Sequence, residues 1–183
     1  MKSIRILICL AILLLSVAAF AQDTVIVGGQ SMYPSKDIVD NAVNSADHTT
    51  LVAAVKAAGL VDTLKGKGPF TVFAPTNEAF KMLPEDAVMN LLKPENKDKL
   101  TAVLTYHVVP GAVDYKGLRK MIKTGNGTAS LKTVQGETLT AMMNGDESIA
   151  LKDEQGNVAN ISIFDVRQSN GVIHVIDHVL MPK

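Results

Sequence analysis

The sequence has 183 residues, a length that suits one domain with its own hydrophobic core. Hydrophobic residues make up 47% and charged residues 20%, 18 basic residues balance 18 acidic ones, and there is one cysteine. This composition excludes a disordered chain, which needs lower hydrophobicity and higher net charge, and it offers no basic excess for binding nucleic acid.

Residues 1–21 have the pattern of a cleaved secretory signal peptide. Two basic residues precede a 12-residue apolar stretch at 6–17, and residues 19–21 form a small-x-small cleavage site. A helix of that length covers about 18 Å of a hydrocarbon layer about 30 Å thick, so we expect cleavage before Gln22 and no stable membrane insertion. The remaining 16 basic and 18 acidic residues give a net charge of −2 and include no cysteine. The sequence therefore predicts an exported protein, periplasmic or extracellular.

The next segment leads into two helices. Residues 22–34 contain two adjacent glycines and a proline without lasting periodicity, which predicts an extended leader. Helical periodicity begins at Ser35, the predicted cap of a first helix that ends near Val43. Asp47 is the predicted cap of a second helix, which Gly59 ends.

The middle of the sequence mixes strands and helices. The β-branched and aromatic run Phe70–Pro75 predicts a strand, and Thr76 is the predicted cap of a helical turn. Pro84 and Pro94 are expected to open two more helices, and a strand is predicted over residues 105–111.

The last third has the character of a sheet. After a predicted helix at residues 115–122, glycines separate runs that alternate or are rich in β-branched residues. These runs cover residues 130–134, 138–143, 148–151, 157–166 and 172–181. Because helices gather in the first half and strands in the second, the sequence predicts an α+β domain with mostly antiparallel strands.

The histidines do not predict a metal site. His174 and His178 have a spacing that binds metal when both lie on one helix face. Their β-branched neighbours instead predict a strand, where positions four apart lie about 13 Å from each other. We therefore expect strand histidines satisfied by hydrogen bonds or solvent, and a surface position for His48. No metal or cofactor is predicted.

The pair Tyr106-His107 leaves two interpretations open. On the predicted strand the two side chains would point to opposite faces, so one ring could enter the core while the other meets polar partners. The favoured interpretation is a buried, hydrogen-bonded pair that ties this segment to the body of the domain. The other is a contact surface.

The usual motifs of catalysis and nucleotide binding are absent from the sequence. It contains no G-x-S-x-G, Walker or G-x-G-x-x-G motif, and Gly125-Asn126-Gly127 predicts a turn. The acidic pairs at 85–86, 146–147 and 153–154 fall at predicted helix starts or turns, where we expect solvated charge. The sequence therefore points to no catalytic residue.

Two segments and the pair between them resemble the signature of the fasciclin-type domain family. Gly68–Phe80 and Asn170–Pro182 look like its two signature boxes, and Tyr106-His107 looks like its central Tyr-His motif. The resemblance covers about residues 35–183, as in a bacterial single-domain member, and implies a wedge-shaped fold. This fold is a strand-rich β-sandwich of about seven strands, with several short helices packed along one edge. The motif positions, expected to serve mainly the fold, are Phe70, Thr71, Val72, Phe73, Ala74, Pro75, Thr76, Asn77, Phe80, Asn170, Gly171, Val172, Ile173, His174, Val175, Ile176, Asp177, Leu180 and Pro182.

The resemblance also implies a function and a candidate contact site. Family members are typically secreted or surface-tethered proteins of adhesion and matrix, without enzymatic activity. In animal members the Tyr-His motif and an Asp-Ile pair before the second box have been implicated in integrin engagement. The matching positions here are Tyr106, His107, Asp165 and Val166, with Val in place of Ile. A bacterium has no integrins, so these positions are a candidate partner-binding surface.

Three functional hypotheses follow. The leading one is an exported adhesion or interaction module, expected to be a monomer, with a protein or polysaccharide partner. The second is a carrier of a small apolar ligand such as a pigment, with Met142 and Met143 lining an adaptable groove; Met82 and Met89 are expected to fill the core. The third, an acid-base enzyme built around His107, requires an open cleft and is excluded if that residue is buried.

Overall fold

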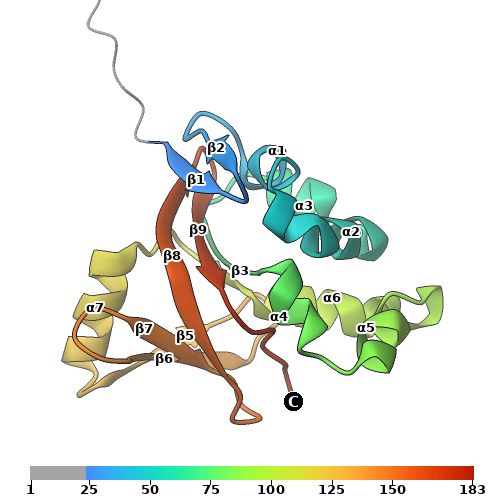
Figure 1. The fold of residues 1–183 in the computed structure, drawn as a ribbon. Coiled ribbons are helices and arrows are strands. Elements are labelled where there is room, and N and C mark those ends of the chain that lie inside the picture. The colour runs from blue at the N-terminus through green and yellow to red at the C-terminus, as the bar shows by residue number, and fades with distance from the viewer. Residues whose placement is uncertain (1–23) are drawn as a thin grey trace, which may run out of the picture.

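The computed structural model describes residues 24–183, so the predicted signal peptide lies outside the described residues (Figure 1). Seven α-helices and two short 3-10 helices occur in this part of the chain: α1 (Ile38–Ala42), η1 (Ala46–His48), α2 (Thr49–Ala58), α3 (Val61–Lys65), α4 (Asn77–Lys81), α5 (Glu85–Leu91), η2 (Pro94–Asn96), α6 (Lys97–Tyr106) and α7 (Tyr115–Thr124). The strands are β1 (Val25–Val27), β2 (Gln30–Met32), β3 (Phe70–Pro75), β4 (Val108–Pro110), β5 (Thr128–Lys132), β6 (Thr138–Met143), β7 (Ile149–Lys152), β8 (Val158–Gln168) and β9 (Gly171–Ile176).

Seven of the strands form one curled sheet. Its order is β4-β3-β9-β8-β7-β6-β5, and every neighbouring pair is antiparallel except β3 and β9. The N–H of Val134, just after β5, donates to the carbonyl of Val108 in β4 at 2.7 Å, so the two edges of the sheet meet. The sheet therefore nearly closes into a barrel, and the predicted α+β class with mostly antiparallel strands is confirmed.

The sheet bends at strand β8. Its first residues pair with β7, its remainder pairs with β9, and the register shifts twice between Ile161 and Val166. Asp165, inside this irregular stretch, has a positive φ of 57°. Bulges of this kind bend a strand and increase its twist, which lets β8 belong to both halves of the sheet.

The two predicted signature boxes are neighbours in space. Phe70–Pro75 of β3 pairs in parallel, residue by residue, with Gly171–Ile176 of β9. The chains approach so closely at the start of this pair that a Cβ on Gly171 would lie 2.2 Å from the Phe70 carbonyl oxygen. Both boxes thus build the central strands, which agrees with the mainly structural role expected for them.

Polar residues of the boxes tie the helices to these strands. The Asn170 side chain accepts from the N–H of Ile38 at 3.0 Å and donates to the carbonyl of Leu64 at 2.7 Å. Thr76 caps α4 as predicted, because its hydroxyl accepts from the N–H of Ala79 at 3.2 Å. Side-chain partners of this kind satisfy backbone groups that helix ends leave free.

The segment predicted as an extended leader is a β-hairpin. Val25–Val27 and Gln30–Met32 pair antiparallel around Gly28 and Gly29, which both have positive φ. Val27 and Met32 are buried in the first hydrophobic cluster. The prediction missed the hairpin because three-residue strands are too short to show alternation.

The predicted starts of the first two helices are each displaced. Asp37, not Ser35, caps α1, since its carboxylate accepts from the N–H of Asp40 at 2.8 Å. Asp47 lies within η1, and the residue before α2 is His48. The predicted stop at Gly59 is confirmed, because this glycine has the left-handed conformation expected at a helix end.

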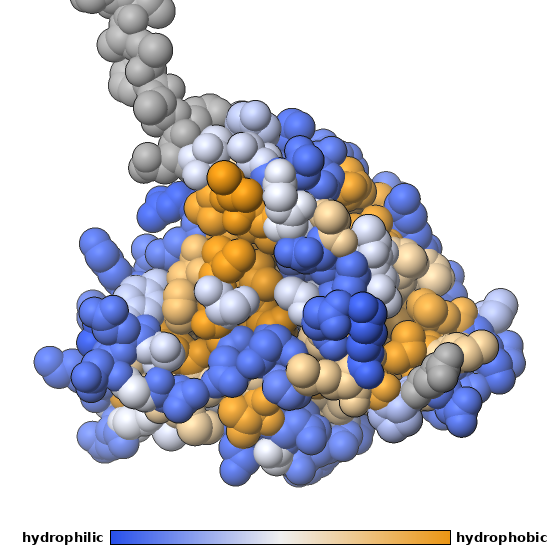
Figure 2. Space-filling view, in the orientation of Figure 1, coloured by the Kyte–Doolittle hydropathy of each residue, from blue (hydrophilic) through white to orange (hydrophobic). Residues whose placement is uncertain are grey.

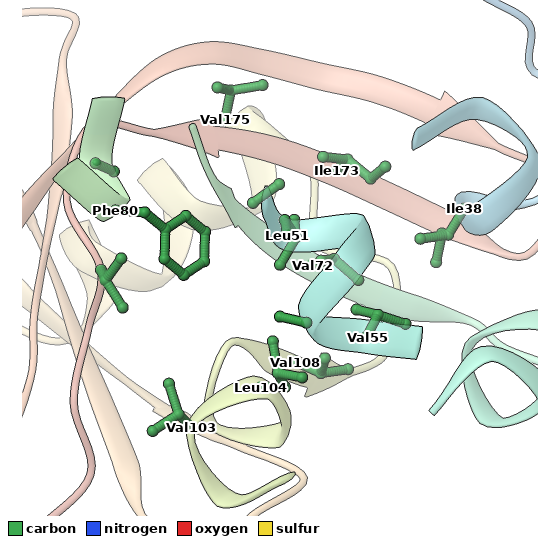
Figure 3. Packing of buried hydrophobic residues seen from close by; sticks show 14 of the residues in the cluster. Ile38, Leu51, Val55, Val72, Phe80, Val103, Leu104, Val108, Ile173 and Val175 are labelled. Carbon is green, nitrogen blue, oxygen red and sulfur yellow. The ribbon is translucent and has the colours of Figure 1, made fainter. Parts of the chain in front are cut away.

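Two hydrophobic clusters hold the fold together. The first lies between the helices α1 to α6 and the strands β3 and β9, and Figure 3 shows Leu51 and Val55 of α2 directed at Val72 of β3. The second fills the interior of the sheet and is covered by α7, on the opposite side from the other helices (Figure 1). Met82 and Met89, expected to fill the core, are instead 61% and 62% exposed: Met82 follows the end of α4, Met89 lies on α5, and both face solvent.

Candidate interaction site

His107 is buried at the end of α6 and not on a strand. It is 3% exposed, its Nδ1 lies 2.8 Å from the carbonyl of Val103, and its Nε2 accepts from the N–H of Leu180 at 3.1 Å. Burial lowers the pKa of this imidazole from 6.5 to about 4. The ring is therefore neutral at neutral pH, with the proton on Nδ1, and it links a helix end to the C-terminal segment.

Tyr106 is the last residue of α6 and is fully buried. Its hydroxyl donates to the carbonyl of Thr138 at 3.0 Å and accepts from the N–H of Glu154 at 3.3 Å. Burial raises the pKa of this phenol to about 12. The interpretation of Tyr106-His107 as a buried, hydrogen-bonded pair is confirmed, although a helix end and not a strand presents it.

The second half of the candidate site, Asp165-Val166, lies on β8. Val166 is 1% exposed and belongs to the first hydrophobic cluster. Asp165 is half-buried, and its carboxylate accepts from the N–H of Tyr115 at 2.7 Å, at the start of α7. No hydrogen bond between Asp165-Val166 and Tyr106-His107 occurs within residues 24–183, so the structure does not join the four positions into one site.

His174 lies beneath Asp165 and is fully buried in β9. Its Nδ1 accepts from the N–H of Asp165 at 3.3 Å, and its Nε2 lies 2.9 Å from the carbonyl of Val113. Its ring stacks on Phe73, with 5.6 Å between the centroids. Burial lowers the pKa of His174, and both of its ring nitrogens have backbone hydrogen-bond partners.

His178 follows β9, and its Nδ1 lies 2.7 Å from the carboxylate of Asp177. His174 lies on strand β9 as predicted, whereas His178 lies two residues beyond its end, and the two rings have separate partners. No cluster of three or more metal-ligating side chains occurs in the described part of the chain.

Asp153 contradicts the expected solvated charge at the pair 153–154. It is 5% exposed, and its carboxylate accepts from the backbone N–H groups of Gln155, Asn157 and Met181 at 2.8 to 3.0 Å. The sequence carried a signal for this, since an Asp followed by Gly and Asn within four residues favours a turn closed by the side chain. The contact with Met181, far along the chain, could not be read from it.

The predicted surface position of His48 is also wrong. It is 3% exposed, and its Nδ1 lies 2.8 Å from the Ser45 hydroxyl, while its Nε2 has no hydrogen-bond partner within residues 24–183. Burial lowers its pKa, and the nearby carbonyl of Ala74 only partly offsets this effect. Its neighbours in sequence are polar because they form a turn. The local sequence therefore does not show that the His48 ring points into the protein.

An apolar cavity lies beside His48, between helix α2 and the sheet. It has a volume of about 90 Å³, and its walls include Leu51 and Val55 of α2, Val72 of β3, Leu104 of α6 and Ile173 of β9. Figure 3 shows these side chains around the space between α2 and β3. Met142 and Met143 lie on β6 and take no part in it, so the groove predicted around them is not where the cavity lies.

The surface divides into two kinds of face. In Figure 2 hydrophobic side chains gather over the central strands and the α5 side, whereas the side that carries α7 is hydrophilic. Of the α7 side chains, Leu118 and Ile122 are buried and the charged ones are exposed. Within residues 24–183, no helix is long and apolar enough to cross a bilayer.

Comparisons with known proteins agree with this architecture. A family model described as the fasciclin domain matches residues 46–182. The chain is 47% identical over 145 residues to protein sll1483 of Synechocystis, covering 79% of this chain and 73% of that protein. It is 34% identical over 172 residues to the cell surface glycolipoprotein MPB83 of Mycobacterium bovis, covering 91% of this chain and 64% of that protein.

A solved structure has the same fold. It is a domain pair from the insect cell adhesion molecule Fasciclin I, with a TM-score of 0.71 and 19% identity over 81% of this chain and 52% of that one. The resemblance seen in the two boxes and the Tyr-His pair is therefore confirmed: the chain belongs to the fasciclin domain family.

Proposed function

We propose that this protein is an exported, non-enzymatic adhesion or interaction module that acts at the cell surface or in the extracellular matrix. The name of one relative describes a cell-surface protein, and the matching structure comes from a cell adhesion molecule. We infer that residues 1–21 are removed on export and that residues 35–183 form the fasciclin-type domain, to which the β1-β2 hairpin adds.

The observation that carries the proposal is the internal use of His107, the residue around which an acid-base enzyme would be built, and of His174. His107 and His174 have both ring nitrogens bonded to backbone groups, and neither reaches solvent. A general acid or base must approach a substrate to within hydrogen-bond distance, which these rings cannot do. The enzyme hypothesis around His107 fails because that ring is buried, and this supports a function carried by the outer surface.

The four positions inferred from the family differ in burial, and only an accessible side chain can contact a partner directly. Tyr106, His107 and Val166 present almost no surface, whereas Asp165 is half-buried. We therefore propose that only Asp165 reaches a partner directly at this end of the sheet, and that the other three hold the surface in shape.

Export and surface action can be tested in the source organism. Mass spectrometry of the protein recovered outside the cytoplasm is expected to give a chain beginning at Gln22. A strain lacking the gene is expected to show weaker attachment or matrix cohesion, restored by the intact gene and not by one lacking the codons for residues 2–21. A full-length chain confined to the cytoplasm would refute the proposal.

A second candidate function, a carrier of a small apolar ligand, is favoured by the cavity under α2. Its volume of about 90 Å³ is well below the roughly 300 Å³ at which drug-sized pockets begin. The ligand would be a short aliphatic molecule or one small ring, and a pigment would require α2 to move away from β3.

Native mass spectrometry of protein purified from its own source tests the carrier function. A bound small molecule is expected in the wild type and in Val158→Phe, whose position is exposed, and not in Val55→Phe, which fills the cavity. A ligand-free mass for the wild type would count against it.

A further inference from the structure

The outer face of α7 carries charge of one sign only. Helix α7 is ten residues long, and four of these residues are basic while none is acidic. The four, all exposed, are Lys116, Arg119, Lys120 and Lys123. Their spacing of three, four and seven residues places them on one side of the helix, along about 10 Å of its axis.

These cations have no acidic partners within the described chain. None of the four takes part in an ion pair among residues 24–183. The acidic residue at the start of the helix, Asp114, uses its carboxylate to cap α7 through the N–H of Gly117 at 2.8 Å and lies 3.8 Å from Arg167. The guanidinium of Arg119 lies over the Tyr115 ring, 5.6 Å from its centroid, which orients its planar fork.

The concentration of charge is notable because the mature chain is acidic overall. It carries 16 basic and 18 acidic residues after position 21, and a quarter of its basic residues lie on this one helix. The other lysine-rich stretch, residues 93–99, has Glu95 and Asp98 interspersed with its lysines. The face of α7 is therefore set up to attract a polyanion while the rest of the surface repels one.

Resting on the proposed function, we propose that the exposed face of α7 binds an acidic polysaccharide, one that carries carboxylate or sulfate groups, in the envelope or matrix. Arginine and lysine donors along a straight helix face suit repeated anionic groups on an extended chain.

An anionic lipid surface is the less favoured partner, because the helix has no apolar face left to insert. Leu118 and Ile122 are 0% and 2% exposed, since they pack into the second hydrophobic cluster. Interfacial helices bind bilayers by burying such a face among the acyl chains.

The test measures binding of a fluorescent alginate oligosaccharide, a chain of uronic acids, to the mature protein by anisotropy. One variant replaces the four α7 cations by glutamine. A matched control makes the same change in net charge by replacing four exposed lysines elsewhere with glutamine: Lys56, Lys93, Lys97 and Lys99. A neutral dextran oligosaccharide, phosphatidylglycerol vesicles and a single-stranded DNA oligomer are the comparison probes.

We expect saturable alginate binding that weakens as salt rises from about 50 mM to about 500 mM, with no binding of dextran. The α7 variant should lose affinity by about tenfold or more, and the matched control by less than about twofold. Equal losses in both variants, no alginate binding by the wild type, or tighter binding to the vesicles or the DNA would overturn the inference. A wild type that binds source cells but not alginate would overturn this inference and leave the proposed function standing.

Discussion

The Nε2 atom of His107 accepts a hydrogen bond from the N–H of Leu180 at 3.1 Å, which joins the end of α6 to the last residues of the chain. The other ring nitrogen lies 2.8 Å from the carbonyl of Val103, one turn earlier in the same helix. The Tyr106 hydroxyl bonds Thr138, at the start of β6, and Glu154, just after β7. The Tyr-His pair therefore connects the end of α6 to two turns of the sheet and to the C-terminal segment, from inside the domain. We propose that its residues affect the surface only through the shape that they maintain.

Replacing His107 by alanine should strongly destabilise the domain. The change leaves the buried carbonyl of Val103 and the N–H of Leu180 without their partner and opens a cavity, so we expect a loss of about 2–4 kcal/mol. Urea unfolding measures it. The control is His178→Ala, whose side chain is 44% exposed and whose loss should stay below about 1 kcal/mol. Similar losses in the two variants would show that the buried bonds do not matter.

Stability should fall as the pH is lowered through the mildly acidic range. Burial lowers the pKa of His107 from 6.5 to about 4, so between these values the unfolded chain binds a proton that the folded chain does not. Its contribution is fully present above about pH 6.5 and is lost as the pH falls toward 4, which amounts to about 2 kcal/mol between pH 7.5 and pH 5. His48 and His174, whose pKa values burial also lowers, act in the same direction.

The matched variant for this pH dependence is His107→Gln, which cannot take up a proton. Urea midpoints at about pH 7.5 and pH 5 should lie closer together in this variant than in the wild type, and the remaining difference reports the other buried histidines. An unchanged difference would contradict the assignment to His107.

Asp165 should tolerate asparagine better than glycine or alanine. Its positive φ of 57° suits Asp, Asn and Gly, and its side chain accepts from the N–H of Tyr115 at 2.7 Å. Asn keeps both features and should cost less than about 1 kcal/mol; Gly loses only the hydrogen bond, at about 1 kcal/mol. Ala loses the bond and adds backbone strain, so about 2–3 kcal/mol is expected. Thermal unfolding in the order Ala, Gly, Asn, wild type checks the series, and an alanine variant as stable as Asn would contradict it.

The N-terminal hairpin should contribute to stability. Met32 is 3% exposed in the first hydrophobic cluster, so Met32→Ala is expected to cost about 2–4 kcal/mol. Ile26, on the facing strand, is 66% exposed, and Ile26→Ala should change stability by less than about 0.5 kcal/mol. Unfolding of both variants in urea measures these changes. If the segment were a detachable leader, neither substitution would change the free energy of unfolding.

Much of the fold could be predicted from local patterns. The sequence predicts strand β3 at its observed bounds because its β-branched and aromatic residues form a continuous run between a Gly-Pro break and the Thr76 cap. The strand predicted over residues 105–111 is longer than β4, since α6 continues to Tyr106 and only residues 108–110 form the strand. Thr105 and Tyr106 favour strands locally, and the packing of α6 decides otherwise.

The candidate site was harder to predict, because burial is a property of the whole fold. The sequence identified Tyr106 and His107 as a pair, yet it could not show that both rings are enclosed by Thr138, Glu154 and Leu180, which lie more than thirty residues away. The cationic face of α7 was readable in principle, since its spacing follows the helical period, but its lack of acidic partners required the structure.

The most direct test of the central claim is the binding of labelled mature protein to intact cells of the source organism that lack the gene. The claim predicts saturable binding that unlabelled protein competes away, with the same affinity for Tyr106→Phe, which loses only internal hydrogen bonds. Absence of saturable binding would contradict an adhesion role. Binding lost in a folded Tyr106→Phe variant would contradict the internal role of the Tyr-His pair.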